Sequence, residues 1–115
     1  MFDVAIVGGS VGGLTLALRL VASDLRIAVF DKNLLPGQKA CGEGVPQWTI
    51  REVNSLLGDL ASFSSVPFSG FRFLRETDEV FSPLCEDHVG IERIRLERLF
   101  VQKLKDAGAA KLFRN

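Results

Sequence analysis

The sequence has few of the residues that hold metal ions or build disulfide frameworks. It contains two cysteines, Cys41 and Cys85, and one histidine. The cysteines show neither metal-ligand spacing nor a disulfide pattern, so we expect no metal site and favour a reducing, cytoplasmic setting. The 14 basic residues balance the 14 acidic ones, and this balance gives no electrostatic basis for binding nucleic acid or an anionic membrane.

A long uninterrupted apolar segment is also missing. The uncharged run from Val4 to Leu18 follows Asp3 rather than a basic stretch. It ends at Arg19, before it reaches the roughly 20 residues that a membrane-spanning helix needs. We therefore expect neither a signal peptide nor a transmembrane segment. The 115 residues contain no internal repeat and fit one ordinary domain.

The N-terminal part of the chain is typical of a βαβ unit, which we place at residues 2–31. Phe2 to Val7 is a short apolar run, as in a strand buried on both faces. Gly12 to Ala22 has apolar residues at helical spacing. Arg26 to Phe30 is apolar and β-branched again, with Asp31 at its end. This order of elements favours a parallel sheet.

The later segments extend the α/β pattern. Residues 32–46 are polar and glycine-rich, and an irregular connection of this length is often functional. The elements expected after it are a helix at 47–57, a β-hairpin at 71–84 whose Pro83 indicates an edge strand, a helix at 94–107, and the start of a strand at 111–115.

The loop between the first strand and helix, GGSVGG at residues 8–13, matches a dinucleotide-binding loop except at its middle. A pyrophosphate needs close backbone approach, N–H donors and a positive helix end. Gly8 would make the tight turn and Gly13 would let the helix pack closely, whereas Ser10 stands where such loops usually have glycine. Taken alone, this pattern also fits a glycine-rich turn that binds nothing.

Asp31 favours a nucleotide site. It lies 23 residues after Gly8 (31 − 8), near the spacing of about 20 expected for the acid that binds a ribose hydroxyl. An acid there would repel a 2′-phosphate, which disfavours NADP as the ligand, but the pattern does not separate NAD from FAD. The sequence thus predicts an α/β, Rossmann-like FAD/NAD(P)-binding fold, incomplete, with a parallel sheet, a βαβ unit and a small β-hairpin insertion.

Four segments resemble the FAD-dependent oxidoreductases of the geranylgeranyl reductase and class A flavoprotein monooxygenase type. DVAIVGGSVGGLTLAL is similar to their FAD fingerprint, and VFDK to the strand end whose acid holds the adenosine ribose. LPGQKACGEGVPQWTIREVNSLLG resembles a segment of the reductase branch, and VGIERIRLERLFVQKLKDAGA resembles the R-x-x-L/F-D/E-x-x-L segment. The resemblance implies FAD as cofactor, with NADPH or NADH as electron donor in an intact member.

The same resemblance and the loop pattern together nominate the cofactor-binding residues. No catalytic residue is assigned. For Arg93 the alternative is an ordinary solvated helix face, and for Cys41 it is a small residue packed in a loop. The candidates are Gly8, Gly9, Ser10, Val11, Gly12, Gly13, Asp31, Lys32, Lys39, Cys41, Gly42 and Arg93.

The later D-G-x-x-S and G-D-A motifs of this family are absent, and the chain resembles only the first third of its members. We therefore expect a fragment or a short derivative, inactive alone, that retains FAD weakly or not at all. An intact enzyme would act on a small isoprenoid, aromatic or other apolar substrate. The alternatives are a plain NAD-binding Rossmann module and a non-catalytic remnant that self-associates through an exposed sheet edge.

Overall fold

The computed structural model describes residues 1–37, 39–58, 65–108 and 110–114. The chain divides into two compact units, each described below by itself. One consists of Met1–Cys41 together with Glu92–Asn115, and the other of Gly42–Ile91.

The first unit contains a three-stranded parallel sheet. Its elements are β1 (Val4–Val7), α1 (Val11–Leu20), β2 (Ile27–Asp31), α3 (Arg93–Ala107) and β6 (Ala110–Arg114). The strand order is β1-β2-β6. Val4 lies opposite Ile27, and Ile27 lies opposite Ala110. Helix α1 connects β1 with β2, and α3 leads into β6, so the Rossmann-like α/β fold with a parallel βαβ unit is confirmed.

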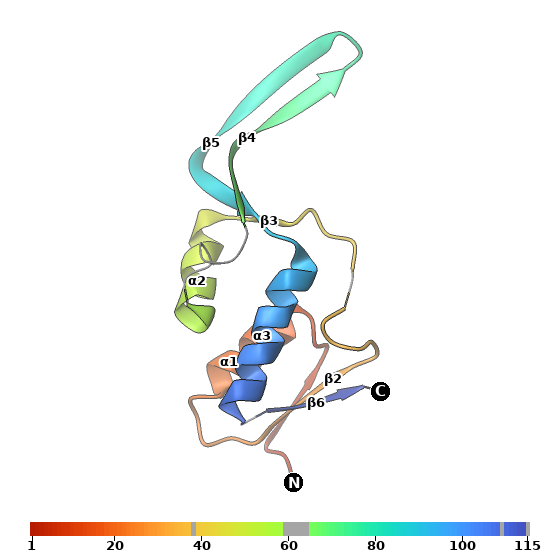
Figure 1. Ribbon diagram of the computed structural model, residues 1–115, viewed down its shortest axis with the longest axis vertical. Coiled ribbons are helices and arrows are strands. Elements are labelled where there is room, and N and C mark those ends of the chain that lie inside the picture. Colours follow the sequence, from red (N-terminus) through yellow and green to blue (C-terminus); the bar gives the residue numbers. More distant parts are fainter. Residues whose placement is uncertain (38, 59–64, 109, 115) are drawn as a thin grey trace. The chain divides into compact units, whose positions relative to one another are not determined.

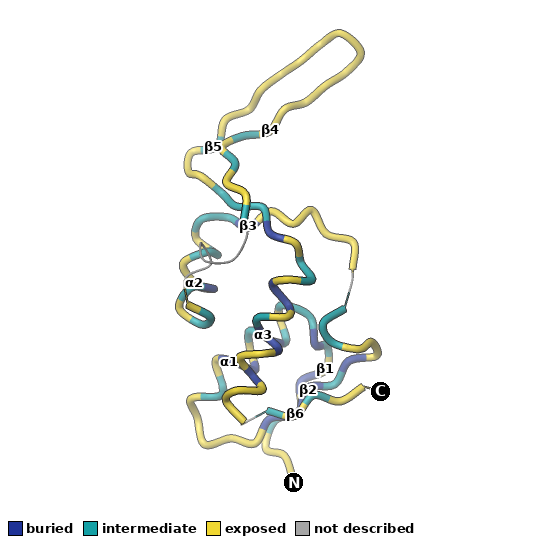
Figure 2. The backbone as a smooth tube through the Cα atoms, viewed as in Figure 1, coloured by how far each residue is buried: buried dark blue, intermediate teal, exposed yellow. Residues whose placement is uncertain are grey.

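The core of this unit lies where α1 and α3 pack on the sheet. The two helices lie side by side (Figure 1), and their apolar residues recur at the three- and four-residue spacing of a helix face. The fully buried residues of this core include Leu14 on α1, Phe100 and Leu104 on α3, and Ile27 and Val29 on β2. Buried stretches are dark blue in Figure 2. This packing brings the N-terminus of α3 to the loop that precedes α1.

Strand β1 differs from the expectation of a strand buried on both faces. Ile6 is buried, but Val7 is 89% exposed. The prediction was wrong because both helices of this unit pack together on one face of the sheet. On the other face Phe30 stacks on Phe113, with ring centroids 5.1 Å apart, and Phe113 stays 36% exposed.

The second unit contains β3 (Gly44–Val45), α2 (Gln47–Leu57), β4 (Val66–Arg75) and β5 (Asp78–Gly90). Its strands form an antiparallel sheet in the order β3-β5-β4. The hairpin of β4 and β5 is longer than the expected 71–84, and β3 lies within the connection 32–46 that was expected to be irregular.

Pro83 lies in β5, which is the middle strand of this sheet rather than an edge strand. Strand β3 reaches only the end of β5, at Val89 and Gly90. Pro83 therefore has a partner only on the β4 side, at Gly70, and its missing N–H interrupts no ladder on the other side. The expected edge position was wrong for the strand as a whole but right for the stretch around Pro83.

Candidate functional site

The turn that leaves β1 requires glycine at its first position. Gly8 has a φ of +103°, which side chains other than glycine rarely adopt. Its N–H donates to the carbonyl oxygen of Phe30 at 2.8 Å, so the turn is tied to the neighbouring strand β2. The chain then enters α1 at Val11, and the start of this helix lies at the carboxyl end of the parallel strands.

Gly13 and Gly12 face different surroundings, although they are adjacent in α1. A Cβ on Gly13 would lie 1.8 Å from the carbonyl oxygen of Gly8, whereas a Cβ on Gly12 would meet nothing within 4 Å. Gly13 is therefore needed for close packing of the helix on its own turn, while the backbone at Gly12 is open. A Cβ on Gly9 would lie 2.2 Å from Leu35 Cδ1, the end of a flexible side chain.

Asp31 is anchored at the carboxyl end of β2 by two backbone donors. The N–H of Gly9 donates to Oδ2 and the N–H of Asn33 to Oδ1, both at 2.8 Å. These bonds, that of Asn33 first, hold the pKa of Asp31 below its ordinary value against the opposing effect of burial. A carboxylate offers about four acceptor positions, so Asp31 can tie the glycine loop to β2 and still accept from a ligand hydroxyl.

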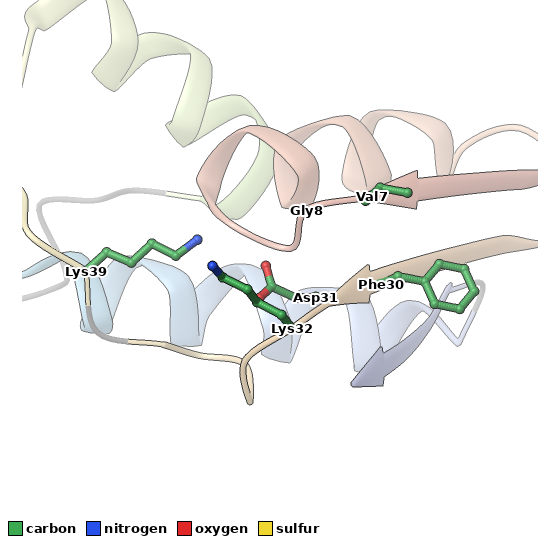
Figure 3. Close-up of a pocket in the computed structure, with 6 residues that line it drawn as sticks. All are labelled: Val7, Gly8, Phe30, Asp31, Lys32 and Lys39. Atoms are coloured by element: carbon green, nitrogen blue, oxygen red, sulfur yellow. The ribbon is translucent and has the colours of Figure 1, made fainter. Parts of the chain in front are cut away.

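A pocket of about 330 Å³ opens beside Asp31. It is lined by Val7, Gly8, Phe30, Asp31, Lys32 and Lys39. In Figure 3 the side chains of Lys32 and Lys39 extend toward one another next to the Asp31 carboxylate. The two ammonium groups also lower the pKa of Asp31, after the backbone hydrogen bonds. The pocket thus combines an acceptor for hydroxyl groups with two cations, a suitable pairing for a phosphorylated ribose ligand.

Ser10 is the N-cap residue of α1, yet its side chain makes no capping hydrogen bond. Its hydroxyl donates to Glu97 Oε1 at 3.3 Å and accepts a short hydrogen bond from Arg93 Nη2. Arg93 in turn donates from Nε to Glu97 Oε1 at 3.0 Å. The hydrogen bond to Glu97 is the largest cause that raises the pKa of Arg93, and one with Cys41 contributes as well.

Arg93 is therefore held in a network with the glycine loop instead of extending along a solvated helix face. The solvated face does exist on α3, where Glu92 and Arg95 form an exposed ion pair at 2.8 Å.

Glu97 belongs to this network and was not among the sequence-predicted residues. Its side chain is 1% exposed, and its Oε2 accepts from the N–H of Gly37 at 3.0 Å. A signal was present in the sequence, because Glu97 falls on the same helical stripe as Phe100 and Leu104. A charged residue at a core position needs buried partners, and Arg93 lies one helical turn away.

The structure does not bring all of the predicted residues together. Gly8, Gly9, Ser10, Asp31, Lys32, Lys39 and Arg93 lie around the start of α1 or the pocket beside Asp31, and Val11 begins α1. Cys41 is exposed, and its side chain hydrogen-bonds to Arg93 beside the glycine loop. Gly42 belongs to the other unit. The described residues include no group of three or more His, Cys, Asp or Glu placed to hold a metal ion.

None of the helices formed by the described residues combines the length and apolar character required to cross a membrane.

Comparison with known proteins places the fold. No protein-family model matches the sequence, and no curated protein matches it significantly. Among solved structures, PqsL of Pseudomonas aeruginosa in complex with 2-aminobenzoylacetate is similar over 98% of this chain, with a TM-score of 0.80 and 16% identity. The flavin-dependent monooxygenase PieE in complex with FAD and substrate is similar over 96%, with a TM-score of 0.78 and 19% identity.

A third similar structure is p-nitrophenol 4-monooxygenase PnpA of Pseudomonas putida, over 100% of this chain with a TM-score of 0.78 and 16% identity. This chain covers 33%, 23% and 32% of the three structures, respectively. The chain therefore has the Rossmann-like fold found in part of the flavin-dependent monooxygenases and spans about a third of their length or less.

Proposed function

We propose that this chain binds the ADP half of FAD and is the nucleotide-binding part of a flavin-dependent oxidoreductase. One observation carries the proposal. Asp31, with its charge held by two backbone N–H groups, lies at the carboxyl end of a parallel strand, directly beside a glycine turn that opens a helix. Open α/β sheets bind nucleotides at this end of their strands.

The residues present fit an adenosine diphosphate group. The Asp31 carboxylate would accept from the ribose hydroxyls, and the N–H groups at the start of α1 would face the diphosphate. The open surroundings of Gly12 would allow close approach of the phosphates to the backbone. Arg93, next to Ser10, adds a positive charge at the same place.

FAD is favoured over NAD by two lines of support. The four sequence segments resemble FAD-dependent oxidoreductases, and similar solved structures include a probable FAD-dependent monooxygenase and a flavin-dependent monooxygenase in complex with FAD. A plain NAD-binding module is the alternative, because it would share the adenosine and diphosphate contacts.

In an intact enzyme the flavin would supply the redox chemistry, either hydride transfer to an isoprenoid-type double bond or activation of oxygen for hydroxylation. The residues of this chain would bind and orient it. NADPH or NADH as donor, a small apolar substrate and a cytoplasmic setting belong to the same proposal.

Isothermal titration calorimetry of the purified chain with FAD, ADP, NAD and FMN tests the proposal. We expect FAD and ADP to bind the same site with similar affinity, because the proposed contacts are to the ADP half. FMN, which lacks that half, should not compete with either. Binding of FMN that FAD displaces but ADP does not would contradict the proposal, and tight NAD binding with no FAD binding would favour the alternative.

A further inference from the structure

Ser10 occupies a position at which its own side chain could compete with a ligand. Serine is among the preferred N-cap residues because its oxygen accepts a hydrogen bond from N–H groups in the first helical turn. Those are the same N–H groups that a bound diphosphate would use. A glycine at this position could not compete, because it has no side chain.

The hydroxyl of Ser10 is instead directed toward α3. Its proton is donated to Glu97 Oε1, and its oxygen accepts from Arg93 Nη2. Both the donor and one acceptor position of the hydroxyl are thus used by α3. The absence of a side-chain capping bond at α1 follows from this arrangement.

Glu97 is the residue on which this arrangement depends. Its Oε1 takes the Ser10 proton and also anchors Arg93 through Nε, at 3.0 Å. Its Oε2 accepts from the N–H of Gly37 in the connection that follows β2. With 1% of its side chain exposed, the carboxylate joins the glycine loop, that connection and α3.

We propose that Glu97 is a positioning residue that holds the Ser10 hydroxyl toward α3 and so keeps the N–H groups at the start of α1 available to the diphosphate of the ligand. This inference rests on the proposed function. A carboxylate repels phosphate, so the role of Glu97 in binding the anionic ligand would be indirect.

The direction in which ADP affinity changes when Glu97 is replaced distinguishes this positioning role from a simple electrostatic effect. Removal of the Glu97 charge raises the local positive charge, and by Coulomb's law alone ADP would bind more tightly. Release of the Ser10 hydroxyl to cap α1 would instead make ADP bind more weakly. Since an N-cap side chain is worth about 1 kcal/mol, we expect a loss of about fivefold in ADP affinity.

The experiment measures ADP affinity of the full chain by calorimetry in a double-mutant cycle of Glu97→Met with Ser10→Gly. Methionine keeps the approximate length of glutamate and removes its polar atoms, and apolar replacements of buried charges are often tolerated. Glu97→Asp is the second variant, because it keeps the charge and only shortens the reach. Glu92→Met is the matched control, since it removes an exposed charge at the N-cap of the same helix.

We expect Glu97→Met and Glu97→Asp to weaken ADP binding, and Ser10→Gly to restore it to within about twofold of the wild type in either background. Glu92→Met should bind ADP as the wild type does, to within the same factor. Adenosine, followed through the amide signals of Asp31 and Asn33, should bind the Glu97 variants as it binds the wild type, because it has no phosphate.

An equal loss of ADP affinity with serine or glycine at position 10 would overturn the inference, since a merely structural role of Glu97 does not depend on Ser10. Unchanged or tighter ADP binding by both Glu97 variants would also overturn it. Failure of the wild-type chain to bind ADP would be a different result, because it would remove the proposed function itself and the inference with it.

Discussion

At the scale of single residues, the glycines of the loop have two different roles, close packing of the helix and access for a ligand, which the sequence pattern does not distinguish. Gly13 is packed against the carbonyl of Gly8, whereas Gly12 is open. Gly13 serves the fold, and Gly12 leaves room for a ligand. Substitution by alanine should therefore affect stability and binding differently at the two positions.

Gly13→Ala should lower the free energy of unfolding by about 1–3 kcal/mol, because the added Cβ overlaps backbone. Gly12→Ala should leave it unchanged or raise it by up to about 1 kcal/mol, since alanine favours a helix, and yet should weaken ADP binding. Urea unfolding and ADP titration of both variants check this pair of opposite effects. ADP affinity unchanged in Gly12→Ala would argue against phosphates at the start of α1.

The charge of Asp31 should make stability depend on pH. The pKa of Asp31 is lowered in the folded state by the N–H groups of Asn33 and Gly9. Its stabilising effect is therefore fully present above the unfolded pKa of about 3.9 and is lost as the pH falls through the lower folded pKa.

At pH 7, Asp31→Asn should lower the free energy of unfolding by about 1–3 kcal/mol, because an amide cannot accept both backbone bonds. The difference in unfolding free energy between the variant and the wild type should narrow as the pH falls below the unfolded pKa of about 3.9. Urea unfolding across this range measures it, with the exposed Asp24→Asn as control. A difference that stays constant as the pH falls would show that the charge of Asp31 is not what stabilises the loop.

At the scale of elements, local patterns in the sequence predict the helices well and the sheets less well. The apolar stripe of Leu96, Phe100 and Leu104 predicts the helix α3, and Gly108, with a φ of +66°, ends it. Strand pairing depends on residues far apart in the chain, so neither the parallel pairing of β2 with β6 nor the full length of β4 and β5 could be read from spacing. The exposure of Val7 likewise depends on which elements cover the sheet.

The residues of the candidate site also divide into those that a local pattern predicts and those that depend on contacts between distant segments. The glycines and Asp31 follow a local pattern and could be nominated directly. The contact of Ser10 with Arg93 and Glu97 joins residues more than eighty positions apart, and only the packing of α1 against α3 creates it. For this reason the role of Glu97 was missed, although its place on an apolar stripe was visible.

The α3 helix should depend on Phe100, which is fully buried. Phe100→Ala should lower the free energy of unfolding by about 3–5 kcal/mol through lost contacts and a cavity. Gln102→Ala, at an exposed position where the side chain donates to Asp106 in the next turn, should change the free energy of unfolding by less than about 0.5 kcal/mol. Thermal or urea unfolding followed by circular dichroism compares the two, and equal effects would contradict the packing described for α3.

At the scale of the whole molecule, the hairpin of β4 and β5 exposes an apolar face. Phe73 lies opposite Val80 and Phe71 opposite Ser82. Phe71, Phe73 and Val80 are 49%, 60% and 62% exposed. Most of the hairpin is coloured as exposed in Figure 2. Exposed apolar strands of this kind promote association between chains.

We expect the wild-type chain to self-associate with rising concentration, and the triple variant Phe71→Thr, Phe73→Thr, Val80→Thr to remain monomeric, since threonine keeps a high strand propensity. Leu74→Thr is the control, because it lies on the other face, beside the ion pair of Arg72 and Glu79 at 3.1 Å. Light scattering after size-exclusion chromatography gives the masses. If the triple variant still self-associates, another surface must be responsible for the association.

The measurement that tests nucleotide binding most directly is an ADP titration of the ¹⁵N-labelled chain followed by amide chemical shifts. The account predicts saturable shifts at Gly8, Gly9, Ser10, Val11, Gly12 and Gly13, together with Asn33, whose N–H donates to Asp31. The amides of β4 and β5 should not move. Absence of any shift in the glycine loop at saturating ADP, or shifts confined to other parts of the chain, would contradict the assignment of this loop as the nucleotide site.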